Sequence, residues 1–254
     1  MLIVNQTIFP NPATSVTQAE TPATAVSERR MRWLEVVVVM SVAFLTPLLG
    51  SIHALIVKRT TPAIVSQYGF TLGSFMLLPP LLTLMYVLWR NGRTFRDIGL
   101  RWSWKDVGVG VMLAIVALLT SGVGGLLLRL ALTAAGMGEA VHASVDTIRH
   151  TWTRSMLLMP GGAAYMTIVP FYEEILVRAY LMTELIDLTG STALAVAVST
   201  LLQASYHLYY GWIGAAAIVF TFLPWALFFA AKRRALPCVT AHWLYDLIAL
   251  LAKR

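Results

Sequence analysis

Six ionisable residues lie within otherwise apolar stretches of the second half of the sequence. They occur in three short segments, PFYEEILVRAYL, SYHLYYGW and CVTAHWLYD. Ionised side chains are energetically costly at membrane depth, and there they commonly mark a functional site. The candidates for chemistry are Glu173, Glu174, Arg178, His207, His242 and Asp246.

The two glutamates have different local surroundings on a helix. Glu174 precedes Arg178 by four residues, which places them face to face in the favourable acidic-before-basic order. Glu173 lies about 100° around the helix and has no such local partner. An unpaired carboxylate can take a proton, so Glu173 is predicted to be a base, with Glu174 and Arg178 as a supporting ion pair. Its helical stripe would continue through Tyr180, Glu184 and Asp187.

Structural explanations stay open for each segment. Pro170 can occupy the first turn of a helix, where both glutamates would favour the positive end of the dipole. A lone histidine such as His207 more often makes one hydrogen bond, here to a neighbouring tyrosine through water. The four-residue spacing of His242 and Asp246 places them on one helix face, where the carboxylate would fix the tautomer of the ring.

Taken together, the three segments favour hydrolysis. One group can take a proton from water while others stabilise the developing oxyanion, with or without a metal ion. The sequence has no H-E-x-x-H zinc motif, no G-x-S-x-G serine motif and no G-x-G-D aspartyl protease motif. Its single cysteine, Cys238, cannot form an intrachain disulfide. The segment HASVDTIRH (142–150) and His53 are predicted to lie in or near solvated loops.

The composition indicates the elements that must position these residues. Of 254 residues, 58% are hydrophobic and 12% are charged, and the mean hydropathy is +0.72. Soluble domains contain about 25% charged residues, so this chain is predicted to be an all-α, polytopic transmembrane helical bundle. The net charge of +7 comes from short loops between apolar runs, and no basic stripe suited to nucleic acid is present.

The predicted organisation is a flexible N-terminal tail at 1–28 followed by a transmembrane domain at 29–254. The run 156–188 is too long for one straight crossing, because it would extend about 50 Å against a hydrocarbon core of about 30 Å. Pro160, Gly161, Gly162 and Pro170 could break it, so seven to eight membrane segments are expected. The predicted spans are 33–56, 68–90, 107–132, 156–188, 192–210, 213–231 and 235–252.

Basic residues between the spans predict the orientation. The loop 90–105 holds the densest basic cluster and should be cytoplasmic by the positive-inside rule. Seven crossings would place the basic clusters 29–32 and 232–234 on the same side. We therefore expect a cytoplasmic N-terminus.

The ordered set E-E-x-x-x-R, a histidine followed by LYYGW, and H-x-x-x-D resembles the CPBP family over residues 155–252. These are the CAAX prenyl proteases of the Ras-converting type and their bacterial relatives, the abortive-infection proteins. The resemblance implies an intramembrane endopeptidase with its protease-like core at 155–252, in which Glu173 and His207 activate a water molecule. His242 and Asp246 would stabilise the oxyanion, and Glu174 and Arg178 would be structural.

Two positions depart from the family pattern. Gln203 stands where the second motif usually has Phe, and Asp246 stands where Asn is more common. The family label of metalloprotease would place zinc on Glu173, His207 and His242, while activation of water by glutamate and histidine without metal is the competing hypothesis.

The resemblance also implies partners and a location. The expected partners are the lipid bilayer and a membrane-associated or prenylated-type peptide or protein substrate, with no nucleic acid. The expected location is the plasma membrane of a bacterium, as an integral multi-pass protein of undetermined oligomeric state. The alternative function is a non-catalytic membrane scaffold or transporter with a buried polar network. The absence of internal repeats and the concentration of polar groups in late helices favour the enzyme.

Overall fold

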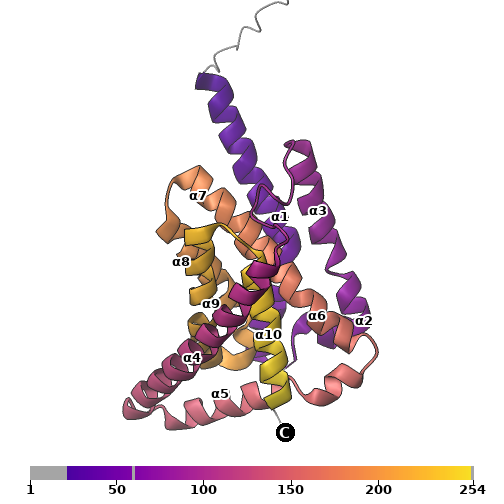
Figure 1. Cartoon of the computed structure of the whole chain (residues 1–254). Coiled ribbons are helices and arrows are strands. Elements are labelled where there is room, and N and C mark those ends of the chain that lie inside the picture. The colour runs from indigo at the N-terminus through magenta and orange to yellow at the C-terminus, as the bar shows by residue number, and fades with distance from the viewer. Residues whose placement is uncertain (1–21, 59–60, 253–254) are drawn as a thin grey trace, which may run out of the picture.

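The computed structural model describes residues 22–58 and 61–252, and all regular elements in these ranges are helical (Figure 1). This confirms the predicted all-α class. Residues 1–21 of the predicted tail lie outside the described residues, and the chain is helical from Pro22. The helices are α1 (Pro22–Ile56), α2 (Ala63–Phe75), α3 (Leu78–Arg90), α4 (Trp104–Ala134), α5 (Gly138–Thr151), η1 (Arg154–Leu158), α6 (Gly162–Glu173), η2 (Glu174–Met182), α7 (Thr183–Thr189), α8 (Thr192–Tyr206), η3 (Leu208–Tyr210), α9 (Gly211–Lys232) and α10 (Leu236–Ala252).

Within residues 22–58 and 61–252, four segments are long and apolar enough to cross a membrane. They are Val26–Ile56, Tyr68–Arg90, Trp104–Ala134 and Leu208–Lys232, and two shorter apolar helices are Thr192–Tyr206 and Leu236–Ala252. Their outward faces carry exposed leucines and valines, as a lipid-facing surface requires. The chain is therefore an integral membrane protein, although the structure does not confirm a count of seven to eight segments.

The long run 156–188 is divided into four helical pieces. It breaks before α6 at Gly161, which has a φ of 75° and lies against the backbone of Thr71. The predicted break at 160–162 is therefore present, whereas Pro170 lies inside α6. From Glu174 to Met182 the chain forms a π-helix, η2, a form that occurs frequently at functional sites.

The wider turns of η2 change which residues share a face. The α-helical stripe predicted from Glu173 through Glu184 and Asp187 does not organise the structure. Glu173 lines an internal cavity, whereas Glu184 and Asp187 form ion pairs with arginines. The prediction assumed about 100° per residue throughout, and a π-helix turns through a smaller angle per residue.

The segment 142–150 was predicted to be a solvated loop, and this is wrong. It forms most of α5, which lies across one end of the bundle (Figure 1). His142 and His150 are exposed, so the prediction that they face solvent is confirmed. The predicted loop conformation of the backbone is wrong. Ser144, on the buried face, donates a hydrogen bond to the carbonyl of Tyr210. His53, also predicted near a loop, lies in the last turn of α1.

Helix α4 packs closely against α10 and α9, and small residues permit the approach. A Cβ atom at Gly110 would lie 2.5 Å from Cβ of Thr240 and 2.8 Å from the carbonyl oxygen of Pro237. Farther along α4, the hydroxyl of Thr120 donates to the carbonyl of Phe220 in α9 at 2.8 Å. These contacts hold α4 beside the two helices that carry part of the site.

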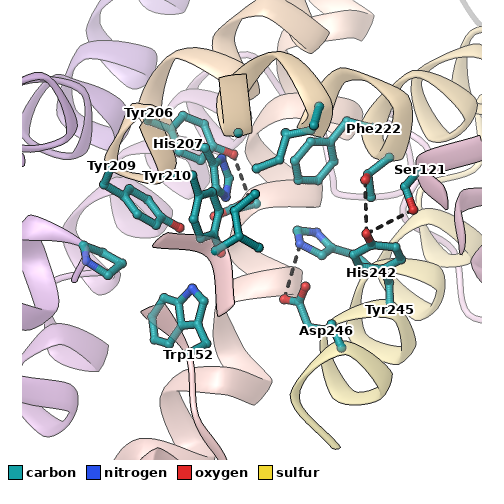
Figure 2. A pocket seen from close by; sticks show the side chains of 18 of the residues that line it. Ser121, Trp152, Tyr206, His207, Tyr209, Tyr210, Phe222, His242, Tyr245 and Asp246 are labelled. Atoms are coloured by element: carbon teal, nitrogen blue, oxygen red, sulfur yellow. Dashed lines mark hydrogen bonds and ion pairs between the residues drawn. The ribbon is translucent and has the colours of Figure 1, made fainter. Parts of the chain in front are cut away.

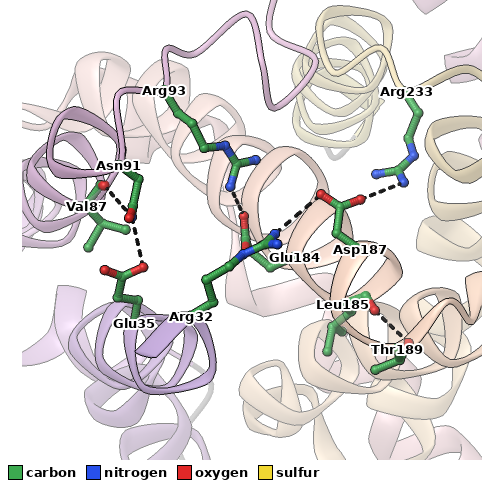
Figure 3. A network of polar contacts seen from close by, with 10 residues as sticks. All are labelled: Arg32, Glu35, Val87, Asn91, Arg93, Glu184, Leu185, Asp187, Thr189 and Arg233. Atoms are coloured by element: carbon green, nitrogen blue, oxygen red, sulfur yellow. Dashed lines mark hydrogen bonds and ion pairs between the residues drawn. The ribbon is translucent and has the colours of Figure 1, made fainter. Parts of the chain in front are cut away.

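Ion pairs join distant segments at the opposite end of the bundle from α5 (Figures 1 and 3). Glu184 of α7 pairs with Arg32 of α1 at 2.8 Å and with Arg93 of the α3–α4 loop. Asp187 pairs with Arg233, which follows α9, at 3.4 Å. One arginine from each of the three basic clusters that were predicted to share a side thus contributes to this network.

Candidate active site

A cavity of about 440 Å³ lies between the helices, and Figure 2 shows its polar and aromatic lining. Residues of α1, α4, α5, α6, α9, α10 and the α8–α9 connection contribute to its wall. The structure brings together on this wall the four residues that the sequence singled out for catalysis. They are Glu173, His207, His242 and Asp246.

Glu173 is the last residue of α6, and its side chain is buried among partners from α8. Its Oε2 accepts a hydrogen bond from the hydroxyl of Tyr206 at 2.7 Å and a long one from Nε2 of Gln203 at 3.5 Å. The sequence correctly left Glu173 without a partner on its own helix. Its partners come instead from a helix that begins nearly twenty residues later.

His207 follows the last residue of α8, where the helix turns into η3. Its Nδ1 lies 2.7 Å from the carbonyl oxygen of Gln203, which can only accept, so Nδ1 carries the proton. In the neutral ring, Nε2 is then an acceptor. Tyr210 stacks on the imidazole at 5.8 Å with an interplanar angle of 13°, and Phe222 packs nearby at 5.6 Å. The direct contact of Nδ1 with the backbone was not among the hydrogen bonds considered from the sequence.

His242 lies between two carboxylates. Its Nδ1 is 3.0 Å from Oε1 of Glu174. Its Nε2 is 3.5 Å from Oδ2 of Asp246, and Figure 2 shows this second contact. Because a carboxylate accepts hydrogen bonds, a ring that donates from both nitrogens satisfies both neighbours. The side chain of Asp246 is 38% exposed, so the Nε2 side of the ring faces the cavity while the Nδ1 side is enclosed.

The predicted pair of Glu174 and Arg178 is present in η2. Nε of Arg178 lies 3.4 Å from Oε2 of Glu174, and both side chains are fully buried. Arg178 also donates to the carbonyl of Phe222 at 3.1 Å, and its guanidinium lies over the ring of that residue at 5.2 Å. The contact from Glu174 to His242 was missed by the sequence analysis. Glu174 therefore links a buried cation to an imidazole on the cavity wall.

Tyr206 was also missed as a partner of Glu173. Its sequence signal is its position three residues after Gln203, which places two hydrogen-bonding side chains on one face of the helix. That signal cannot identify the partner, because Glu173 is 33 residues away in the sequence.

The predicted zinc ligands do not fit a metal ion as they are arranged. Among the described residues, no group of three or more His, Cys, Asp or Glu side chains could hold a metal ion. Both ring nitrogens of His242 already face carboxylates, so neither is available to a metal ion in this arrangement.

The arrangement combines groups suited to water activation. A buried carboxylate with one oxygen held by donors, an imidazole with a free acceptor nitrogen, and a second imidazole between carboxylates share one cavity. The first two can deprotonate and orient water, and the third can donate to a developing oxyanion.

Comparison with known proteins identifies the same region. A family model described as type II CAAX prenyl endopeptidase Rce1-like matches residues 155–248. No curated protein and no solved structure matches this chain. The matched segment contains all four cavity residues named above. The match over residues 155–248 confirms the CPBP resemblance predicted from the motifs.

Proposed function

We propose that this protein is an intramembrane endopeptidase in which Glu173 and His207 activate the attacking water. The observation that carries the proposal is the convergence of Glu173, His207, His242 and Asp246 on one cavity within an apolar bundle. The family match to residues 155–248 supports the same reaction class.

In the proposed reaction, a water molecule lies between the carboxylate of Glu173 and Nε2 of His207. Glu173 takes one proton from the water, whose oxygen forms a bond to the carbonyl carbon of the scissile peptide. The electron pair of the carbonyl bond moves to its oxygen, and Nε2–H of His242 donates to that oxyanion. The C–N bond then breaks, and the proton held by Glu173 passes to the leaving nitrogen, which yields a carboxylic acid and an amine.

Asp246 has a positioning role in this scheme. Its contact with Nε2 of His242 is long, at 3.5 Å, so a substrate carbonyl oxygen can take its place as the acceptor. Glu174 holds Nδ1 of the same ring at 3.0 Å and is itself paired with Arg178. The ring is therefore oriented from its enclosed side while its other side remains available.

The proposed substrate is a membrane-associated or prenylated-type peptide or protein. The walls of the cavity are formed largely by aromatic and aliphatic side chains, which suits an apolar segment beside the scissile bond. We also propose the plasma membrane of a bacterium as the location, with a cytoplasmic N-terminus. The shared position of the basic clusters at one end of the bundle supports that orientation.

The test is peptide cleavage by the purified protein in proteoliposomes. Glu173→Gln keeps the shape of the side chain but removes its basicity, so we expect cleavage to fall by about 10²- to 10⁴-fold. His207→Ala should show a loss of comparable order. Full cleavage by Glu173→Gln would show that the catalytic assignment is wrong.

A matched control comes from a carboxylate remote from the cavity. Asp97 lies in the α3–α4 loop, where the backbone and hydroxyl of Thr94 donate to it. Asp97→Asn should therefore leave cleavage unchanged while making the same chemical substitution of an amide for an acid.

A further inference from the structure

Two donors from one face of α8 converge on a single oxygen of Glu173. Tyr206 donates from its hydroxyl at 2.7 Å, and Gln203 donates from its side-chain amide at 3.5 Å. Both bonds end on Oε2, and within the described part of the chain none is made to Oε1. Gln203 is fully buried and Tyr206 is 5% exposed, so neither donor is shared with bulk solvent.

The hydroxyl of Tyr206 is held in place by its ring. Phe44 of α1 stacks on that ring with centroids 5.0 Å apart and an interplanar angle of 19°. The ring of His207 also packs against it, with centroids 4.7 Å apart. These two contacts restrict the ring, and its hydroxyl donates to Oε2 of Glu173.

A carboxylate that is held through one oxygen has a defined orientation for the other. Rotation of the carboxylate away from this orientation would break the short bond from Tyr206, and a half-turn only exchanges two equivalent oxygens. With Oε2 fixed, Oε1 is the oxygen left for a water molecule in the cavity, which Glu173 lines. Fixing a catalytic group before the reaction reduces the reorganisation that the reaction must drive.

We propose that Tyr206, assisted by Gln203, is a positioning residue that anchors Oε2 of Glu173 and thereby presents Oε1 to the attacking water. This rests on the proposed function, because it assigns the supporting contacts of the same base. Gln203 stands where the related family usually has Phe. This chain therefore has a hydrogen-bond donor at a position where a phenylalanine ring could not donate to Glu173.

The test compares two tyrosine-to-phenylalanine variants that each remove one buried hydroxyl. Tyr206→Phe removes the bond to Glu173. Tyr172→Phe removes a bond of 2.9 Å to the carbonyl of Ala43, which lies on α1. The readouts are kcat and KM for a fluorogenic peptide in proteoliposomes, with the unfolding temperature of each variant measured in the same lipid.

We expect Tyr206→Phe to lower kcat by about 10- to 100-fold, the range for a hydrogen bond to a charged group. KM should stay within about twofold, because this hydroxyl donates to Glu173 and its proton is not available to the substrate. Gln203→Leu should lower kcat less, since its bond is longer. Tyr172→Phe should lose as much thermal stability as Tyr206→Phe while kcat stays within about twofold of the wild type.

Glu173→Gln, measured alongside, separates the two proposals. If it retains cleavage, the base assignment fails. If it abolishes cleavage while Tyr206→Phe matches Tyr172→Phe in kcat, only the positioning role of Tyr206 is overturned. A parallel rise in KM and fall in stability for Tyr206→Phe, with kcat unchanged, would overturn it as well.

Two further measurements test the proposal if Tyr206→Phe does not fold or if the peptide is not cleaved. A fluorinated tyrosine at position 206 keeps the ring and makes its hydroxyl a stronger donor, so kcat should change and KM should not. Reversible unfolding of the wild type, Tyr206→Phe, Glu173→Gln and the double variant should show coupling between the two residues. Unchanged kcat in the first, or additive effects in the second, would overturn the proposal.

Discussion

At the residue scale, this site is defined by which atom of each side chain remains available. Glu173 is held through Oε2, His207 through Nδ1, and His242 through Nδ1 by Glu174. In each case a second polar atom of the same group is left outside that contact. The three side chains line one cavity.

Asp246 stands where Asn is more common in the related family, and this difference leads to a prediction for the substitution Asp246→Asn. Asp246→Asn should keep kcat/KM within about tenfold of the wild type, because the amide oxygen can still accept from Nε2 of His242 and the amide can donate to an oxyanion. Asp246→Leu removes both possibilities and should lower kcat/KM by about 10²-fold. Cleavage of the peptide substrate by the two variants, side by side, checks this. An equal loss in both would mean that the negative charge itself is needed.

At the element scale, the π-helix η2 has the clearest consequence. It begins at Glu174, directly after the last α-helical residue Glu173, so the change of helix type falls between the two glutamates. Glu173 lines the cavity, while Glu174 is enclosed with Arg178 and His242. Adjacent residues of the same type thus acquire different surroundings.

Close helix packing gives a prediction for α4. Gly110→Leu should destabilise the bundle by about 1–3 kcal/mol, because the new side chain meets Thr240 and the backbone of Pro237 on α10. The measurement is thermal or denaturant-induced unfolding in detergent. Gly108→Leu, at a position with open space around it, is the matched control and should change stability by under about 1 kcal/mol. Similar losses in the two variants would argue against a close α4–α10 contact.

At the scale of the whole molecule, the ion-pair network ties the N-terminal half to the half that carries the site. Glu184 joins α1 and the α3–α4 loop to α7, and Asp187 adds the segment after α9 (Figure 3). Glu35 adds a further link between α1 and Arg90 of α3 at 3.3 Å. Since α1 also supplies Phe44 to the ring of Tyr206, the position of α1 bears on the site.

The network predicts unequal effects for its two acidic residues. Glu184→Gln should destabilise the protein by about 1–3 kcal/mol, because a buried carboxylate that serves two arginines is lost. The partial exposure of both arginines keeps this below the value for a fully enclosed pair. Asp187→Asn, at a carboxylate 39% exposed, should lose less than about 1 kcal/mol. Unfolding in detergent gives both values. A larger loss of stability for Asp187→Asn would contradict the inference that Glu184 contributes more to the network than Asp187.

The sequence by itself determined the class of this protein and singled out four polar residues that line its cavity. Apolar runs longer than a membrane core can only be satisfied as helices there, because every backbone polar group needs an internal partner. The rarity of ionisable residues in such runs made Glu173, His207, His242 and Asp246 conspicuous. The pair of Glu174 and Arg178 followed from their spacing alone.

Only the tertiary structure decided how these residues are used. The partners of Glu173 lie on α8, the second partner of Glu174 lies on α10, and α5 is a helix where a loop was predicted. Helical periodicity describes which residues of one segment share a face, so it carries no information about which distant segment packs against that face. The π-helix η2 also has a smaller angle per residue than the α-helix that the pattern assumed. The faces that meet are set by packing between helices.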